Sequence, residues 1–259
     1  MAANEPGQPA IGRGAFTHNL AVPAVALAIG AHPDDVEFGA GGTLAKWADA
    51  GCVVHHLICT DGSKGTWNPD ADIVALIEQR RREQSEAARR LSGARAGLVL
   101  FLDHVDGELD SNLQARGEVA GVIRELRPDV VLGHDPWKRY RLHPDHRHAG
   151  FLACEGIVGA RDPHFFREQG LAPHRPAALL LFEADEPDHA EDVGGNDGGF
   201  VERKLDALEA HVSQFESTMK ALDDQQLVAF RQRISARLTE LGEPFGYAAA
   251  EVFKLITDL

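Results

Sequence analysis

Short apolar runs alternate with helical patterns along most of this sequence, and this alternation limits the folds that the chain can adopt. The first run, residues 24–31, is continuously apolar, as expected of a strand buried on both faces of a parallel sheet. Similar runs follow at 53–60, 97–104, 129–135 and 177–184, with helical patterns at about 43–51, 71–91 and 113–127 and around Phe151. Because parallel strands need crossover connections, we predict a Rossmann-like, three-layer α/β fold with a mostly parallel sheet and helices on both faces.

The last third of the chain continues this order less clearly. Residues 185–199, DEPDHAEDVGGNDGG, are acidic and glycine-rich, which predicts a mobile loop rather than a domain boundary. Two helices are expected at 200–215 and 218–241, and residues 248–256 predict an edge strand. A chain of 259 residues is therefore expected to form one domain, 1–259, with residues 1–20 as a loose N-terminal segment.

Composition and charge exclude several classes of protein. Hydrophobic residues make up 44% and charged residues 25%, which is typical of a globular domain. The apolar runs are shorter than the roughly 20 residues that span a bilayer, and the N-terminus lacks a signal-peptide pattern, so we expect a cytoplasmic protein. A formal net charge of −14 opposes nucleic-acid and membrane partners. Cys52, Cys59 and Cys154 form no C-x-x-C pair and are interpreted as core residues.

Two clusters of histidine and aspartate follow the first and fourth predicted strands. They comprise His32, Asp34 and Asp35, and then His134, Asp135, His143, Asp145 and His146. Ligands of open α/β sheets bind at the carboxyl ends of the strands, so both clusters are expected at the same edge. A catalytic zinc site typically takes three histidine or carboxylate ligands and leaves a fourth position for water. The two loops together can supply such a set.

Each cluster alone also has a purely structural interpretation. Asp34 and Asp35 after a strand are typical of turn and N-cap residues. Pro144 suits the first position of a helix, which would make His143 and His146 capping or surface residues. These interpretations explain each cluster separately but not their convergence on one edge, so convergence favours a metal site.

With these motifs, the sequence resembles the PIG-L or LmbE-like zinc N-deacetylases, which include N-acetylglucosaminyl-phosphatidylinositol deacetylase and the deacetylases of mycothiol and bacillithiol synthesis. The resemblance spans most of the chain, and the ordered A-H-P-D-D and H-P-D-H motifs are highly specific. It rests on AHPDDVEFGAGGTLAKWADAG (31–51), TDGSKGT (60–66), RRREQSEAARRLSG (80–93) and HPDHRHAG (143–150), with a weaker echo in KLDALEAHVSQF and AEVF.

The resemblance implies a zinc-dependent enzyme that removes an N-acetyl group from a small amino-sugar conjugate of the N-acetylglucosamine type. The implied zinc ligands are His32, Asp35 and His146. Asp34 would be the general base that accepts a proton from the zinc-activated water. His143, protonated with the help of Asp145, would stabilise the oxyanion or protonate the departing amine.

Two arginines are candidates for substrate contact. Arg80 occupies the position of a family arginine near the site, although a solvated charge on a helix face explains it nearly as well. Arg141 stands where some relatives place a tyrosine that assists the oxyanion, and Tyr140 lies beside it, so the residue that assists His143 is left open. Many relatives continue A-H-P-D-D with Glu, whereas this chain has Val36 before Glu, a difference that does not affect the implied ligands.

Other functions fit less well or stay open. The dinucleotide fingerprint fails because Leu44 stands where its third glycine should be, and a nucleophile elbow at Ser63 fails because Asp61 replaces a required glycine. A zinc hydratase or lyase of a small carboxylic acid and a non-catalytic zinc or sugar-binding module are the open alternatives, although Asp34 and His143 favour an enzyme. The sequence determines neither the acyl acceptor nor whether a homo-oligomer forms.

Overall fold

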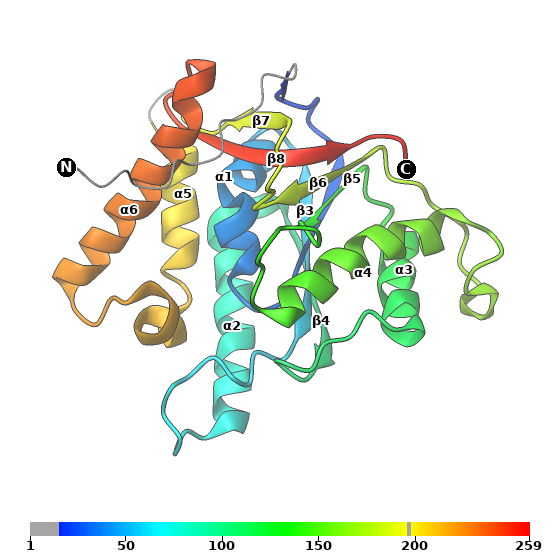
Figure 1. Ribbon diagram of the computed structural model, residues 1–259, viewed down its shortest axis with the longest axis horizontal. Coiled ribbons are helices and arrows are strands. Elements are labelled where there is room, and N and C mark those ends of the chain that lie inside the picture. The colour runs from blue at the N-terminus through cyan, green and yellow to red at the C-terminus, as the bar shows by residue number, and fades with distance from the viewer. Residues whose placement is uncertain (1–15, 196–197) are drawn as a thin grey trace, which may run out of the picture.

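An eight-stranded sheet forms the centre of the computed structural model, which describes residues 16–195 and 198–259 (Figure 1). The strand order is β1-β7-β8-β6-β5-β2-β3-β4. The strands are β1 Thr17–His18, β2 Val25–Gly30, β3 Val53–Thr60, β4 Ala96–His104, β5 Val130–His134, β6 Ala178–Phe182, β7 His189–Asp192 and β8 Ala250–Ile256. β8 runs antiparallel to β6 and β7, and every other pairing in this sheet is parallel. The predicted mostly parallel α/β fold is therefore confirmed.

Helices cover both faces of the sheet (Figure 1). They are α1 Asp35–Asp49, α2 Ile73–Ser92, α3 Leu113–Leu126, α4 Pro144–Arg161, α5 Gly199–Leu208 and α6 Asp224–Gly242. Short 3-10 turns lie at Gly93–Arg95, Arg167–Gln169, Val212–Gln214 and Glu243–Phe245, and a single π-helical turn lies at Phe215–Met219. α1, α2 and α5 share one core with the sheet, whereas α3 and α4 share the other.

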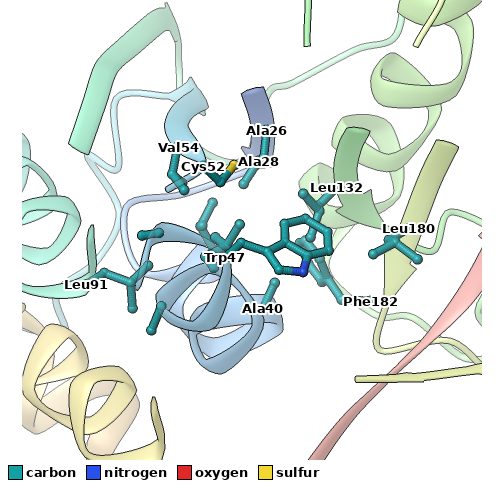
Figure 2. Packing of buried hydrophobic residues seen from close by; sticks show 14 of the residues in the cluster. Ala26, Ala28, Ala40, Trp47, Cys52, Val54, Leu91, Leu132, Leu180 and Phe182 are labelled. Atoms are coloured by element: carbon teal, nitrogen blue, oxygen red, sulfur yellow. The ribbon is translucent and has the colours of Figure 1, made fainter. Parts of the chain in front are cut away.

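β2 lies between these two cores, which explains why its sequence is continuously apolar. Ala26 and Ala28 face the core of α1, while Leu27 and Ile29 face the core of α3 and α4. Small residues on one side leave room for the α1 indole, Trp47, which extends towards Leu132 and Phe182 of the neighbouring strands (Figure 2). Complete burial of each such large side chain contributes roughly 1.5–3 kcal/mol, so this central packing holds the strand ends in place.

α1 begins at Asp35, eight positions before the helix expected at 43–51. The reason is that its three early glycines are packing residues rather than turn residues. A Cβ on Gly39 would lie 2.5 Å from the Phe182 ring, and one on Gly42 would lie 3.0 Å from Val193. The glycines therefore let α1 approach β6 and its neighbours closely.

A buried ion pair between Lys204 and Glu251 lies beside α1, next to Gly42. Glu251 of β8 accepts hydrogen bonds from the backbone N–H groups of Gly42 and Thr43, at 2.9 and 2.7 Å. Lys204 of α5 donates to the Phe38 carbonyl at 2.8 Å and lies 2.6 Å from the Glu251 carboxylate. The pair therefore ties α1 to both the C-terminal strand and α5.

Several expectations for the last third of the chain are wrong, and the described part of the N-terminal segment contains a short strand. β7 lies within the segment predicted as a mobile loop, and β8 is an internal strand between β7 and β6 rather than an edge strand. β1 falls within the segment 1–20 that was expected to be loose, while residues 1–15 lie outside the described part. β7 reads as a loop because its buried residues are polar: His189 and Glu191 contact each other at 2.8 Å. The helix expected at 200–215 ends at Leu208.

The three cysteines lie in the core, in agreement with the sequence analysis. Cys52 and Cys59 are buried, and Cys154 is half-buried. Burial raises the pKa of the Cys52 thiol to about 11 and that of Cys154 to about 12, as expected of unreactive core thiols. Among the described residues, no helix is both long enough and apolar enough to cross a membrane.

Candidate metal centre and active site

A pocket of about 460 Å³ opens where the loops after β2, β3, β4 and β6 meet the start of α4. It is lined by His32, Asp34, Asp35, Phe38, Lys64, Gly65, Arg80, Asp106, Gly107, His143, His146, Glu183, Gln214 and Thr218. All five strand-following loops up to β6 leave the same edge because β2 to β6 are parallel. The predicted convergence of the two histidine and aspartate clusters is therefore confirmed.

Asp35 is the hub of this cluster. Its Oδ1 lies 3.2 Å from Nε2 of His146, and its Oδ2 lies 3.2 Å from Nε2 of His134 and 3.3 Å from Nδ1 of His32. Burial alone would raise the pKa of Asp35, but His146 and His134 outweigh it and hold the pKa well below the ordinary value. One ionised carboxylate thus gathers imidazole nitrogens from a loop, a strand end and a helix.

His32 is oriented by two further carboxylates. Its Nε2 lies 3.1 Å from Oδ2 of Asp145 and 3.2 Å from Oδ1 of Asp106, so this nitrogen carries a proton and donates it. Burial lowers the pKa of His32, but the hydrogen bonds with Asp106, Asp145 and Asp35 raise it well above the ordinary value. A cation is therefore favoured at this position. Once His32 is neutral, Nδ1 is the nitrogen that can ligate a metal ion.

His134 has the opposite arrangement. Its Nδ1 accepts a hydrogen bond from Nη1 of Arg141 at 3.2 Å, and because guanidinium only donates, the proton of a neutral His134 lies on Nε2. That Nε2 faces Asp35. A protonated nitrogen cannot bind a metal ion, so this arrangement favours His32 over His134 as the histidine ligand beside His146.

Asp34 is the N-cap residue of α1 by position, yet its side chain makes no capping hydrogen bond. Its backbone lies in the left-handed region, with φ 109° and ψ −28°, which is rare for a residue with a side chain. Its carboxylate lines the pocket, and Oδ2 lies 3.7 Å from Nη2 of Arg80. Burial raises the pKa of Asp34 to about 6, with Arg80 opposing the rise. A carboxylate with such a pKa can exchange a proton near neutral pH.

His143 and Asp145 are arranged differently from the sequence-based expectation. Oδ2 of Asp145 accepts hydrogen bonds from His32 and from the Gly107 backbone N–H, at 3.1 and 2.6 Å. Burial lowers the pKa of His143, and the adjacent His32 and His146 lower it further. Asp145 does raise the pKa of His143, as predicted, but by less than these effects. The net effect holds the pKa of His143 below its ordinary value, which favours the neutral imidazole near neutral pH.

The comparisons with known proteins agree with this geometry. The family model described as PIG-L, GlcNAc-PI de-N-acetylase, matches residues 27–157. The chain belongs to the PIG-L family. Both clusters lie within the matched region.

Relatives of this PIG-L chain include deacetylases and a hydratase. A diacetylchitobiose deacetylase of Thermococcus kodakarensis is 38% identical, in a match that covers 73% of this chain and 69% of that protein. The solved structure of N,N'-diacetylchitobiose deacetylase from Pyrococcus horikoshii has a TM-score of 0.80 and is 30% identical, covering 91% of this chain and 84% of that one. A 4-oxalmesaconate hydratase of Pseudomonas putida is 29% identical, in a match covering 58% of this chain and 62% of that protein.

Of the two arginines that were predicted to contact substrate, Arg80 lines the pocket and Arg141 does not. Arg80 is 2% exposed, so its interpretation as a solvated charge is wrong. It lines the pocket, and its guanidinium donates to the carbonyl oxygens of Gly62 and Pro33 at 2.9 and 2.7 Å. Arg141 lies behind the pocket lining, between His134 and Glu183. Arg141 does not line the pocket, so the structure gives no support to its direct contact with a substrate. Substrate contact by Arg80 stays a prediction.

Other predicted residues have structural roles. Asp135 accepts the backbone N–H groups of Trp137 and Asp185, at 2.9 and 3.3 Å, and so shapes the loop after β5. Asp61 accepts the N–H groups of Ser63 and Asp106 at 2.9 and 3.1 Å. These turns give no support to a serine nucleophile.

Sequence reasoning missed several residues of the PIG-L pocket. Asp106 and Glu183 follow strands β4 and β6, and that position was the signal that could have identified them. Gln214 ends a 3-10 turn and Thr218 lies in the π-helical turn that follows it, where ordinary helix was expected for both residues. The quoted motif KLDALEAHVSQF contains the first of these two, so the resemblance could have indicated it.

Proposed function

We propose that this PIG-L chain is a zinc-dependent deacetylase that hydrolyses the N-acetyl amide of a small N-acetylglucosamine-type molecule. The observation that carries the proposal is Asp34, a buried pocket carboxylate with a pKa near 6, placed directly before the histidine-gathering Asp35. The 38% identity to a diacetylchitobiose deacetylase supports the choice of bond.

The proposed metal ligands are Nδ1 of His32, the Asp35 carboxylate and Nε2 of His146. The fit rests on the donor set, because imidazole and carboxylate ligands suit zinc, and on the three carboxylates that surround His32 and favour a cation there. When bound, the zinc ion would polarise the attacking water and the amide carbonyl. Asp106 and Asp145 would hold His32 in the ligating tautomer through its Nε2–H.

The remaining pocket residues would move protons and bind the sugar. Asp34 would accept the proton of the attacking water as the tetrahedral oxyanion forms. His143 has a lowered pKa, so once protonated it releases its proton readily, which suits transfer to the departing amine. The rim supplies donors and acceptors for hydroxyl groups from Lys64, Glu183 and Thr218.

A hydratase is the second candidate, favoured by the 29% identity to 4-oxalmesaconate hydratase. In that reaction the same base would deprotonate water for addition to a double bond of an unsaturated carboxylic acid. The deacetylase relative is more similar and matches a larger share of both chains, so hydrolysis is preferred.

A two-arm assay tests the proposal. Purified protein is incubated with diacetylchitobiose and a panel of N-acetylglucosamine conjugates, and released acetate and free amine are measured. Parallel samples receive unsaturated dicarboxylic acids, and loss of their ultraviolet absorbance is followed. Acetate release that stops on chelation and returns with added zinc is expected. Hydration without deacetylation of any conjugate would replace the proposal with the hydratase, and zinc binding without either reaction would leave a non-catalytic module.

A further inference from the structure

The peptide group between Pro33 and Asp34 is held at both of its polar atoms by α2. The Pro33 carbonyl accepts a hydrogen bond from Nη2 of Arg80 at 2.7 Å, and the Asp34 N–H donates to Oε1 of Gln84 at 2.9 Å. Arg80 and Gln84 are four residues apart and so lie on one face of the helix. A residue such as Asp34 stays in the left-handed region only when its surroundings hold it there. The two hydrogen bonds from α2 supply that constraint.

The direction of the Asp34 carboxylate depends on that peptide. Its side chain makes no capping hydrogen bond, and its ion contact with Arg80 is as long as 3.7 Å. The backbone conformation, rather than a hydrogen bond of the carboxylate itself, therefore aims the side chain into the pocket.

The amide of Gln84 is oriented in turn by Glu37. Nε2 of Gln84 donates to Oε1 of Glu37 at 2.8 Å and lies 3.2 Å from Nδ1 of His56. A carboxylate accepts but does not donate, so Glu37 requires the amide nitrogen of Gln84 on its side and leaves the amide oxygen for Asp34. The reverse orientation would set the amide N–H₂ against the Asp34 N–H.

Glu37 and Gln84 act at a distance from the pocket. Both side chains are fully buried, as are His56 and His211, and Oε2 of Glu37 lies 3.4 Å from Nε2 of His211. Neither Glu37 nor Gln84 lines the pocket. The hydrogen bonds of this buried acid and amide lead to the pocket through the backbone N–H of Asp34.

We propose that Glu37 and Gln84 are positioning residues. Their chain of hydrogen bonds from Glu37 through Gln84 to the Asp34 N–H, here called the relay, holds the Pro33–Asp34 peptide in place and thereby orients the Asp34 carboxylate towards the pocket. The measurement of kcat in the test below rests on the proposed deacetylation. The test of the relay does not depend on it, because hydrogen exchange at the Asp34 amide reports on the relay without any reaction.

The experiment breaks and then rebuilds the relay in the metal-loaded protein. Gln84→Met keeps the side-chain size but removes the acceptor for Asp34, and we expect kcat to fall by about 10- to 100-fold with KM unchanged. Gln84→Glu sets two buried carboxylates against each other and should also lower kcat. Gln84→Glu combined with Glu37→Gln restores one donor facing one acceptor, and should recover most of the loss.

Two further measurements separate positioning from general stability. Hydrogen exchange at the Asp34 amide should be slow in the wild type and in the double variant and faster in Gln84→Met, while the bound zinc per chain stays constant. A matched control exchanges Gln114 and Glu118 of α3, which make the same Gln-to-Glu hydrogen bond at 2.9 Å outside the pocket. This control, Gln114→Glu with Glu118→Gln, should leave kcat unchanged.

Three results would overturn the relay: wild-type kcat in Gln84→Met, an Asp34 amide that stays protected in that variant, or a double variant no better than Gln84→Glu. If Gln84→Met does not fold, the comparison of Gln84→Glu with the double variant decides. A wild type that releases no acetate contradicts the proposed function, and the exchange measurement then still tests the relay.

Discussion

Replacing Asp34 with Asn should remove activity and at the same time stabilise the metal-free protein. The pKa of this buried carboxyl is raised from 3.8 to about 6. Because the folded-state pKa lies above the unfolded one, the stability contributed by the protonated form is complete below pH 3.8 and is lost as the pH rises through 6. At 1.36 kcal/mol for each pKa unit, ionised Asp34 lowers the free energy of unfolding above pH 6 by about 3 kcal/mol.

The assay compares urea unfolding of chelator-treated wild type and Asp34→Asn between pH 4.5 and 7.5. The asparagine does not ionise, so its advantage should grow across this interval towards about 3 kcal/mol. Zinc-loaded Asp34→Asn should keep its metal and lose at least about 100-fold in kcat, the typical effect of a general base.

The neighbouring residue supplies the matched control. The pKa of Asp35 is held well below its ordinary value, so its ionised form stabilises the folded state above pH 3.8, and that stability is lost as the pH falls through the folded pKa. Asp35→Asn should therefore destabilise the metal-free protein at pH 7.5 and also lose zinc. The reasoning fails if both variants change stability in the same direction at pH 7.5, or if Asp34→Asn retains near-wild-type activity.

Three more substitutions test the site and its support. His146→Ala should lower bound zinc, measured by elemental analysis, far below one ion per chain; full occupancy would exclude His146 as a ligand. Gly39→Ala should destabilise by about 1–3 kcal/mol in urea unfolding because its Cβ meets the buried ring of Phe182, whereas Gly121→Ala, with only a flexible side chain at 3.4 Å, should be neutral or stabilising. Lys204→Met should reduce the free energy of unfolding by about 3–5 kcal/mol, because it leaves the buried Glu251 carboxylate without its counter-charge; a smaller change than in Gly39→Ala would contradict this.

The sequence by itself determined the layered fold and the convergence of the two histidine and aspartate clusters. An apolar run such as that of β2 reflects burial on both faces, and parallel strands bring their carboxyl ends to one edge. The positions of His32 and His146 after such elements were therefore sufficient to place them together. The position of Pro144 in the first turn of α4 could be predicted equally well, because it depends only on local backbone geometry.

Only the tertiary structure decided which polar residues are buried and what each one contacts. β7 could not be recognised because its buried residues His189 and Glu191 are polar and find their partners in each other and in distant segments, so hydrophobic periodicity carries no signal there. The start of α1 was predicted eight residues too late because Phe182, distant in the sequence, is what requires a glycine in its first turns. The tautomer of His32 depends in the same way on Asp106, and the Asp34 N–H finds its acceptor in Gln84. Periodicity and turn propensity report on neighbours along the chain, whereas each of these contacts joins segments that meet only after folding.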